Sequence, residues 1–244
     1  VYPTGSHALN NIDLKINDGE FVFIIGASGA GKSTLLRAIA SLGDLQGGVI
    51  TINGVSTNEL RSAELARMMA FVNTERVQVE AMTAYDLVAV GRSPHTDWSG
   101  RLRSHDHEVV ERSLQVAGVE HLAERYVETL SDGECQRVMI ARALAQETPA
   151  ILLDEPTSYL DMPNRYELCT LLSRLAHDEG KCVIFSTHEL DIALTLADNI
   201  ALVDNPQLYY MPTDEMIASG NIERLFDSRH VAFDAATRTI SFKR

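Results

Sequence analysis

The stretch GASGAGKST, from Gly26 to Thr34, matches the pattern G-x-x-x-x-G-K-[ST]. Its glycines allow the backbone to turn tightly and to point successive N–H groups into a concave site for an anion. A helix expected from Lys32 onward adds the positive end of its dipole. We expect Lys32 to reach the β- and γ-phosphates of a nucleotide and Ser33 to bind magnesium. The nucleotide-binding residues predicted here are Gly26, Ala27, Ser28, Gly29, Ala30, Gly31, Lys32, Ser33 and Thr34.

A second group of chemically capable residues ends the apolar run AILLDEP. A carboxylate at the carboxyl end of a core strand lies where open α/β sheets bind ligands. Asp154 is therefore expected to hold the magnesium ion, directly or through water. Glu155 is expected to polarise the attacking water as a general base.

The third stretch, LSDGECQR, begins a helix by its local chemistry. Ser131 and Glu134 have the spacing of a capping box, in which each side chain satisfies an amide of the first turn. Asp132 adds negative charge where the helix dipole favours it.

These residues must be positioned by an α/β fold, because apolar runs and helical periodicity alternate along the chain. A buried strand at 21–25 is followed by the glycine-rich turn and a helix from 32 to about 41. Further strands are expected at 49–52, 69–73, 150–153, 182–186, 200–203, 208–211 and 239–242, with helices between the last two. Residues 75–148 are expected to form a mostly helical subdomain within one domain that spans 1–244.

Composition limits the possible partners and the compartment. The 244 residues carry a formal net charge of −13, which argues against a nucleic-acid partner held by bulk electrostatics. The sequence has no apolar run of the roughly 20 residues that a membrane-spanning helix needs and no visible signal peptide, and it opens at Val1 without a methionine. Three cysteines without metal or disulfide spacing suggest structural thiols in a reducing cytosol.

With the phosphate-binding loop, LSDGECQR and AILLDEP following one another in this order along the sequence, the chain resembles the nucleotide-binding subunits of ABC transporters over essentially its whole length. The resemblance implies an α/β ATPase core with a mixed or parallel sheet, an α-helical subdomain insertion and a small antiparallel β portion. LSDGE is similar to the signature motif usually written LSGGQ. SYLD resembles the D-loop, with Asp161, and STHE resembles the switch region, with His188 as a catalytic residue beside Glu155. Tyr2 stands about where the family places an aromatic residue that stacks on adenine.

The resemblance implies a head-to-tail homodimer that holds ATP and Mg²⁺ between two copies. The signature residues Ser131, Asp132, Gly133 and Glu134 of one copy would then act on the ATP bound by the other. Asp132 and Glu134 replace the second glycine and the glutamine of the motif, and we expect both side chains to turn back onto their own helix.

One departure concerns the loop FVNTERVQ, where the family supplies a glutamine that touches magnesium. The aligned position is Thr74, beside Glu75, and either could ligate a hard cation through oxygen. A shifted Gln78, or a loop that touches no metal, are the alternatives.

The stretch VGRSPHTDW resembles importer subunits for iron–siderophore complexes, haem and vitamin B12. This implies a subunit at the cytoplasmic face of the inner membrane, bound to permease subunits and served by a substrate-binding protein. Taken alone, Pro94 and Trp98 would instead indicate a surface turn with a packed aromatic residue. The histidines of RSHDHE favour a solvated helix start over a metal site.

Other classes remain to be distinguished. A soluble ABC ATPase acting on DNA or ribosomes usually has a coiled-coil insertion or two cassettes, together with basic surfaces. This sequence has one cassette, no heptad run and an acidic net charge, which argues against that class. The GRSPHTDW stretch argues against an exporter cassette, and Glu155 and His188 argue against a nucleotide switch that does not hydrolyse.

Overall fold

The structure is a computed structural model that describes residues 9, 12–43, 45–73, 79–227 and 231–243. Tyr2, Thr74, Glu75 and Gln78 lie outside the described residues, so the interpretations placed on them stay predictions. The chain divides into two compact units. The first unit comprises the described residues within 1–48, 153–155 and 172–244, and the second comprises those within 49–152 and 156–171.

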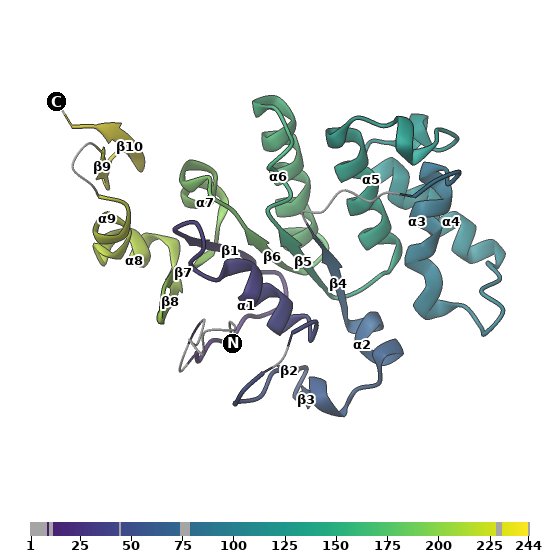
Figure 1. Cartoon of the computed structure of the whole chain (residues 1–244), viewed down its shortest axis with the longest axis horizontal. Coiled ribbons are helices and arrows are strands. Elements are labelled where there is room, and N and C mark those ends of the chain that lie inside the picture. The colour runs from purple at the N-terminus through teal and green to yellow at the C-terminus, as the bar shows by residue number, and fades with distance from the viewer. Residues whose placement is uncertain (1–8, 10–11, 44, 74–78, 228–230, 244) are drawn as a thin grey trace. The chain divides into compact units, whose positions relative to one another are not determined.

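The first unit is built on a mixed sheet in which the strands β6, β1, β7 and β8 are neighbours in that order (Figure 1). β1 is parallel to both β6 and β7, whereas β7 and β8 are antiparallel. The bounds are Phe21–Gly26 for β1, Cys182–Ser186 for β6, Asn199–Asp204 for β7 and Gln207–Pro212 for β8. The predicted mixed sheet is confirmed.

Burial explains why β1 reads as a continuous apolar run. All six of its residues are buried, as expected for a parallel strand covered on both faces. Phe23 lies between Phe21 and Phe185, with both pairs of ring centroids 4.6 Å apart. This aromatic cluster anchors β1 and β6, the strands that lead to Gly26 and Ser186.

Helices and a small hairpin complete the first unit. Their bounds are α1 Lys32–Ile39, α7 Leu190–Leu196, α8 Thr213–Ala218, α9 Asn221–Phe226, β9 Val231–Asp234 and β10 Thr239–Phe242. α1 and α7 pack against β1. β9 and β10 pair antiparallel, with Ile240 opposite Phe233. The sequence predicted β10 but not its partner β9.

The second unit is largely helical. Its elements are β2 Thr51–Ile52, β3 Val55–Ser56, η1 Thr57–Glu59, α2 Ser62–Met68, β4 Met69–Val72, α3 Ala84–Ala89, η2 Val90–His95, α4 Ser104–Val116, η3 Glu120–Leu122, η4 Val127–Thr129 and α5 Asp132–Ala145. α3, α4 and α5 pack on one another (Figure 1). Two elements belong to both units, β5 Ala150–Asp154 and α6 Met162–His177.

The GRSPH stretch is a packing element of the second unit. A side chain at Gly91 would collide with the Arg142 carbonyl of α5, so only glycine fits there. Arg92 is 2% exposed, and its guanidinium donates to Asp106 of α4 and to the Ala145 carbonyl at the end of α5. The segment therefore joins α4 to the carboxyl end of α5.

Trp98 contradicts the interpretation of a packed aromatic residue, since its relative exposure is 99%. It lies between η2 and α4, where Asp97 closes a turn by accepting hydrogen bonds from the Ser99 and Gly100 amides. That turn leaves the indole outside the apolar contacts of η2.

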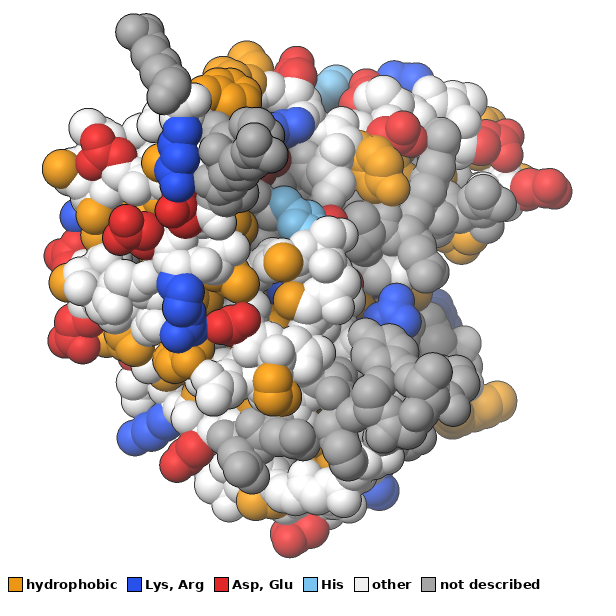
Figure 2. All heavy atoms as spheres, turned by 60° about the vertical axis from the view of Figure 1, so that its left-hand side comes forward, with side chains coloured by type: hydrophobic (Ala, Val, Ile, Leu, Met, Phe, Trp, Pro, Cys, Tyr) orange, Lys and Arg blue, Asp and Glu red, His pale blue; other side chains and the backbone are white. Residues whose placement is uncertain are grey.

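Charge is spread over the surface that Figure 2 shows. On this face, acidic and basic side chains of the described residues are interspersed, with hydrophobic side chains between them. The acidic excess of the chain therefore does not gather into a single patch on this face.

Candidate nucleotide site

The phosphate-binding loop connects the buried strand β1 to the helix α1 in the first unit. Gly26 ends the strand at φ 155°, and a Cβ atom there would lie 2.6 Å from the Val203 carbonyl oxygen of β7. Gly31 precedes the helix at φ 110°. These two glycines are required by close approach and by backbone conformation, which confirms the predicted strand, turn and helix around the loop.

Lys32 follows this loop as the first residue of α1 and is 4% exposed. Its Nζ donates to the carbonyl oxygens of Gly26 and Ala27, at 3.1 and 3.3 Å. Burial lowers the pKa of the Lys32 ammonium, and the carboxylates of Glu155 and Asp154 oppose that shift. The cation is thus held where β1 ends, among groups that it can exchange for phosphate oxygens.

Asp154 ends β5 and is joined to the loop by Ser33. The Ser33 hydroxyl donates to Asp154 Oδ1 at 2.9 Å, and the Ser186 hydroxyl donates to the same oxygen at 2.7 Å. Asp154 as a whole residue is 3% exposed. A hydroxyl and a carboxylate in direct contact are hard oxygen donors, and both residues predicted as metal ligands therefore lie together.

Glu155 has a strained backbone, because its φ of 47° falls in the left-handed region that non-glycine residues rarely adopt. Its amide donates to both the carbonyl oxygen and the hydroxyl of Ser186, at 3.1 and 3.0 Å. These two bonds fix the residue just beyond the end of β5. The left-handed backbone conformation at Glu155 turns the chain out of the strand that ends at Asp154.

His188 completes the cluster. Its Nε2 lies 2.5 Å from Glu155 Oε1, and Lys32 Nζ lies 3.3 Å from both ring nitrogens. His188 thus lies between the Glu155 carboxylate and the Lys32 ammonium. The predicted residues Lys32, Asp154, Glu155 and His188 thus meet in one place.

The signature stretch forms the start of α5 in the second unit. Ser131 caps the helix, its Oγ accepting from the Glu134 amide at 3.3 Å. Glu134 Oε2 in turn accepts from both the amide and the hydroxyl of Ser131, at 2.8 Å each. These bonds lower the pKa of Glu134, and Arg125 contributes a weaker effect. The predicted capping box and the return of Glu134 onto its own helix are confirmed.

Asp161 caps another helix of the same unit. Its Oδ1 accepts from the amide of Asn164 at 3.1 Å and from the side-chain Nδ2 of Asn164 at 2.6 Å. The Asp161 side chain therefore caps the start of α6 through one carboxylate oxygen. Asp161 belongs to the second unit with Ser131, whereas Lys32 and Glu155 belong to the first.

Three residues that hydrogen-bond to predicted site residues were not themselves assigned a function from the sequence. Ser186 binds both Asp154 and Glu155, while Arg137 and Asn164 lead to Asp161. A serine that ends an apolar strand is a weak signal, and Arg137 and Asn164 are 27 positions apart. Only the pairing of elements in space brings these side chains into contact.

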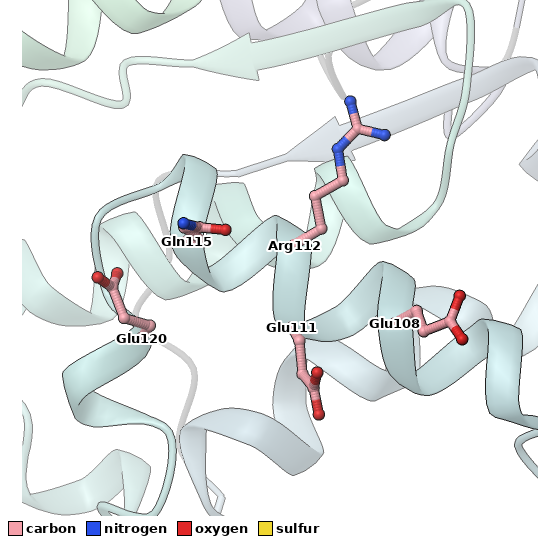
Figure 3. A pocket seen from close by; sticks show the side chains of 5 residues that line it. All are labelled: Glu108, Glu111, Arg112, Gln115 and Glu120. Atoms are coloured by element: carbon pink, nitrogen blue, oxygen red, sulfur yellow. The ribbon is translucent and has the colours of Figure 1, made fainter.

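A hollow on the second unit does not fit a nucleotide. Its volume is about 370 Å³, and it is lined by Glu108, Glu111, Arg112 and Gln115 of α4 and Glu120 of η3. Figure 3 shows these side chains pointing in different directions rather than toward a common centre. Three carboxylates would also repel phosphate.

Comparisons with known proteins agree with this geometry. Residues 9–158 match the family described as ABC transporter. An ABC transporter ATP-binding protein of Methanocaldococcus jannaschii is 40% identical over 226 residues, covering 92% of this chain and 78% of the relative. The ferric enterobactin transport ATP-binding protein FepC of Escherichia coli is 36% identical, covering 92% and 83%.

Solved structures give the same result. A dimeric bacterial ABC transporter cassette is 31% identical, with a TM-score of 0.76, and covers 87% of this chain and 94% of the other. A structure described as a metal-chelate type ABC transporter in an inward-facing conformation is 31% identical, with a TM-score of 0.78, and covers 88% and 82%.

A phosphate-binding loop beside strand-end carboxylates, on a mixed sheet, defines a nucleoside triphosphatase of the phosphate-loop class. The chain belongs to the ABC transporter family, as one of its ATP-binding proteins. It is an ATPase of that family. Among the described residues, no helix has the length and apolar character needed to cross a membrane.

Proposed function

We propose that this chain is the ATP-hydrolysing subunit of an importer for iron–siderophore complexes. It works as a head-to-tail homodimer at the cytoplasmic face of the membrane, bound to permease subunits that receive cargo from a substrate-binding protein. Haem and cobalamin-like compounds are the alternative cargoes. The meeting of Lys32, Asp154, Glu155 and His188 at the ends of three strands carries the hydrolytic part of this proposal.

The chemical roles follow from the contacts. Lys32 exchanges the carbonyl oxygens of Gly26 and Ala27 for the β- and γ-phosphate oxygens of ATP. Ser33 and Asp154 would hold Mg²⁺, which neutralises phosphate charge when bound.

Glu155 acts as the general base that takes a proton from the attacking water. His188 positions it through the contact between Nε2 and Oε1, and Ser186 holds its backbone. Because Glu155 is followed by a turn rather than by further strand, its carboxylate can face the bound phosphates while Asp154 faces the metal.

The second copy supplies the remaining groups. Ser131 and Gly133, at the start of α5, present a helix N-terminus to the γ-phosphate held by the partner, and Asp161 contributes from the neighbouring turn. The dimeric ABC cassettes among the related structures, one of which holds ADP and phosphate, support this arrangement.

Support for the cargo comes from the relatives. YusV of Bacillus subtilis is named a probable siderophore transport protein. FepC is named for ferric enterobactin transport, and FpuD of Bacillus anthracis, 36% identical over 216 residues, is named for petrobactin import. The similarity to a metal-chelate type transporter points the same way.

The cargo is tested by measuring uptake of a labelled ferric siderophore, haem or cobalamin in cells with and without this chain. If removing the chain abolished only the uptake of haem or cobalamin, our choice of cargo would be contradicted.

Glu155→Gln tests the composite site. We expect it to bind ATP, to hydrolyse it at least about 100-fold more slowly, and to accumulate as an ATP-dependent dimer in size-exclusion chromatography. Glu179→Gln is a matched control, since it removes the same charge from an exposed position of the first unit. A Glu155→Gln protein that stays monomeric at saturating ATP would contradict the shared site.

A further inference from the structure

A chain of hydrogen bonds in the second unit connects α5 to the start of α6. Arg137 of α5 donates through Nη2 to Asn164 Oδ1 at 2.9 Å and to Glu167 Oε2 at 2.7 Å. Asn164 then donates through Nδ2 to Asp161 Oδ1 at 2.6 Å. Arg137 lies on the helix that Ser131 caps, so the chain joins the signature helix to the carboxylate of Asp161.

The two segments also touch through an apolar contact nearer to the signature residues. Leu160, next to Asp161, is 4% exposed, and a Cβ atom at Gly133 would lie 3.1 Å from its Cδ2. The first turn of α5 and the turn before α6 are therefore packed without spare room. A side chain larger than hydrogen at Gly133 would press on Leu160.

The side-chain amide of Asn164 matches the hydrogen-bonding groups on both of its sides. Its oxygen can only accept, and it faces the Arg137 guanidinium, which can only donate. Its nitrogen can only donate, and it faces the Asp161 carboxylate, which accepts. The same Asp161 oxygen accepts from the Asn164 backbone amide. The carboxylate is thus held by two donors of one residue, and that residue is held by Arg137.

We infer that Arg137 and Asn164 are positioning residues that keep the Asp161 carboxylate in register with Ser131 and Gly133. The two segments then meet a second copy of the chain as one block. This inference rests on the proposed function, because it assigns a purpose to the block only where two copies share ATP. It predicts that Arg137 and Asn164 act on dimer formation without touching nucleotide.

The experiment measures ATP-dependent dimerisation of the full chain in the Glu155→Gln background, together with ATP affinity of the monomer. Asn164→Ala and Arg137→Gln are each expected to raise the dimer dissociation constant about ten-fold, because side chains that they release must be ordered again when the dimer forms. Monomer affinity for ATP should stay within about two-fold, since neither residue belongs to the phosphate-binding loop.

The double variant should have a dimer dissociation constant little higher than that of either single variant, because both substitutions interrupt the same series of hydrogen bonds. Glu167→Gln is the matched control. It also contacts Arg137, but its side chain is 67% exposed and does not lead to Asp161, so dimerisation should be unchanged.

The outcomes separate this inference from the proposed function. If Glu155→Gln itself fails to dimerise with ATP, the proposed function is wrong. If it dimerises and Asn164→Ala dimerises equally well, the positioning role is wrong. Equal losses with Glu167→Gln, or an equal loss of ATP affinity in the monomer, would also overturn it, because the effect would then be general structural damage.

Discussion

Replacing Arg92 by leucine should destabilise the second unit more than most single substitutions. The guanidinium is buried with only 3% of its side chain exposed, and Asp106 beside it has 7% exposed. Its Nε donates to Asp106 at 2.9 Å, and its Nη1 donates to the Ala145 carbonyl at 2.8 Å and to Glu147 at 2.7 Å.

The magnitude follows from what the substitution leaves behind. Asp106 would remain buried without its cation, and the Ala145 carbonyl at the end of α5 would lose its donor. Breaking a buried ion pair in this way typically costs about 3–5 kcal/mol of unfolding free energy. The midpoint of thermal unfolding should fall by about 10 °C for a chain of this size.

Differential scanning calorimetry of the purified chain measures this loss, and two variants define its origin. Glu147→Gln removes a partner whose side chain is 45% exposed, and its effect should stay within about 1 kcal/mol. The double variant Arg92→Leu with Asp106→Leu should recover most of the stability, because an apolar pair of similar volume replaces a buried ion pair at little cost.

The pH dependence gives a further test of the same pair. The Arg103 amide, and then the Arg92 guanidinium, hold the pKa of Asp106 below its usual value. A carboxyl with a lowered pKa stabilises the folded state above its unfolded pKa and loses that contribution as pH falls through the folded pKa. The difference in stability between the native chain and Arg92→Leu should therefore be largest near neutral pH and shrink in acid. This account would be refuted if Arg92→Leu were as stable as the native chain. It would also be refuted if the double variant were no more stable than Arg92→Leu alone.

Two predictions concern the nucleotide site. Lys32→Ala should raise the dissociation constant for ATP at least about ten-fold, because a charge-assisted hydrogen bond to phosphate is lost; fluorescence titration with a labelled ATP measures it, and unchanged affinity would exclude the loop from phosphate binding. Glu134→Gln keeps an oxygen that can accept from Ser131 while it removes a negative charge, so ATP-dependent dimerisation in the Glu155→Gln background should become tighter, most clearly at low salt. Weaker dimerisation, measured by analytical ultracentrifugation, would contradict that charge argument.

Part of this site could be predicted from sequence because its determinants are local. The phosphate-binding loop and the capping box of Ser131 and Glu134 depend on residues within one turn of each other. The spacing of residues along the sequence is therefore enough to predict both the anion-binding amides of the loop and the amides that the capping side chains satisfy. The strand that ends at Asp154 was equally visible, because it is an apolar run that is almost entirely buried.

Other predictions failed or were not possible because they depend on contacts between distant elements. The sequence gives no sign that the turn at Asp97 leaves Trp98 exposed or that β9 pairs with β10. The prediction for the Asp132 side chain stays untested. Strand pairing and the direction of a loop are decided by the surfaces on which they pack.

The sequence by itself identified a glycine-rich loop of the kind that binds a nucleoside triphosphate, and two acids that follow a core strand. Only the tertiary structure decided that Ser186 binds both acids and that His188 contacts both Lys32 and Glu155. The physical reason is that hydrogen bonds between side chains require contact within about 3 Å, and the packing of parallel strands brings such atoms together from positions far apart in the chain.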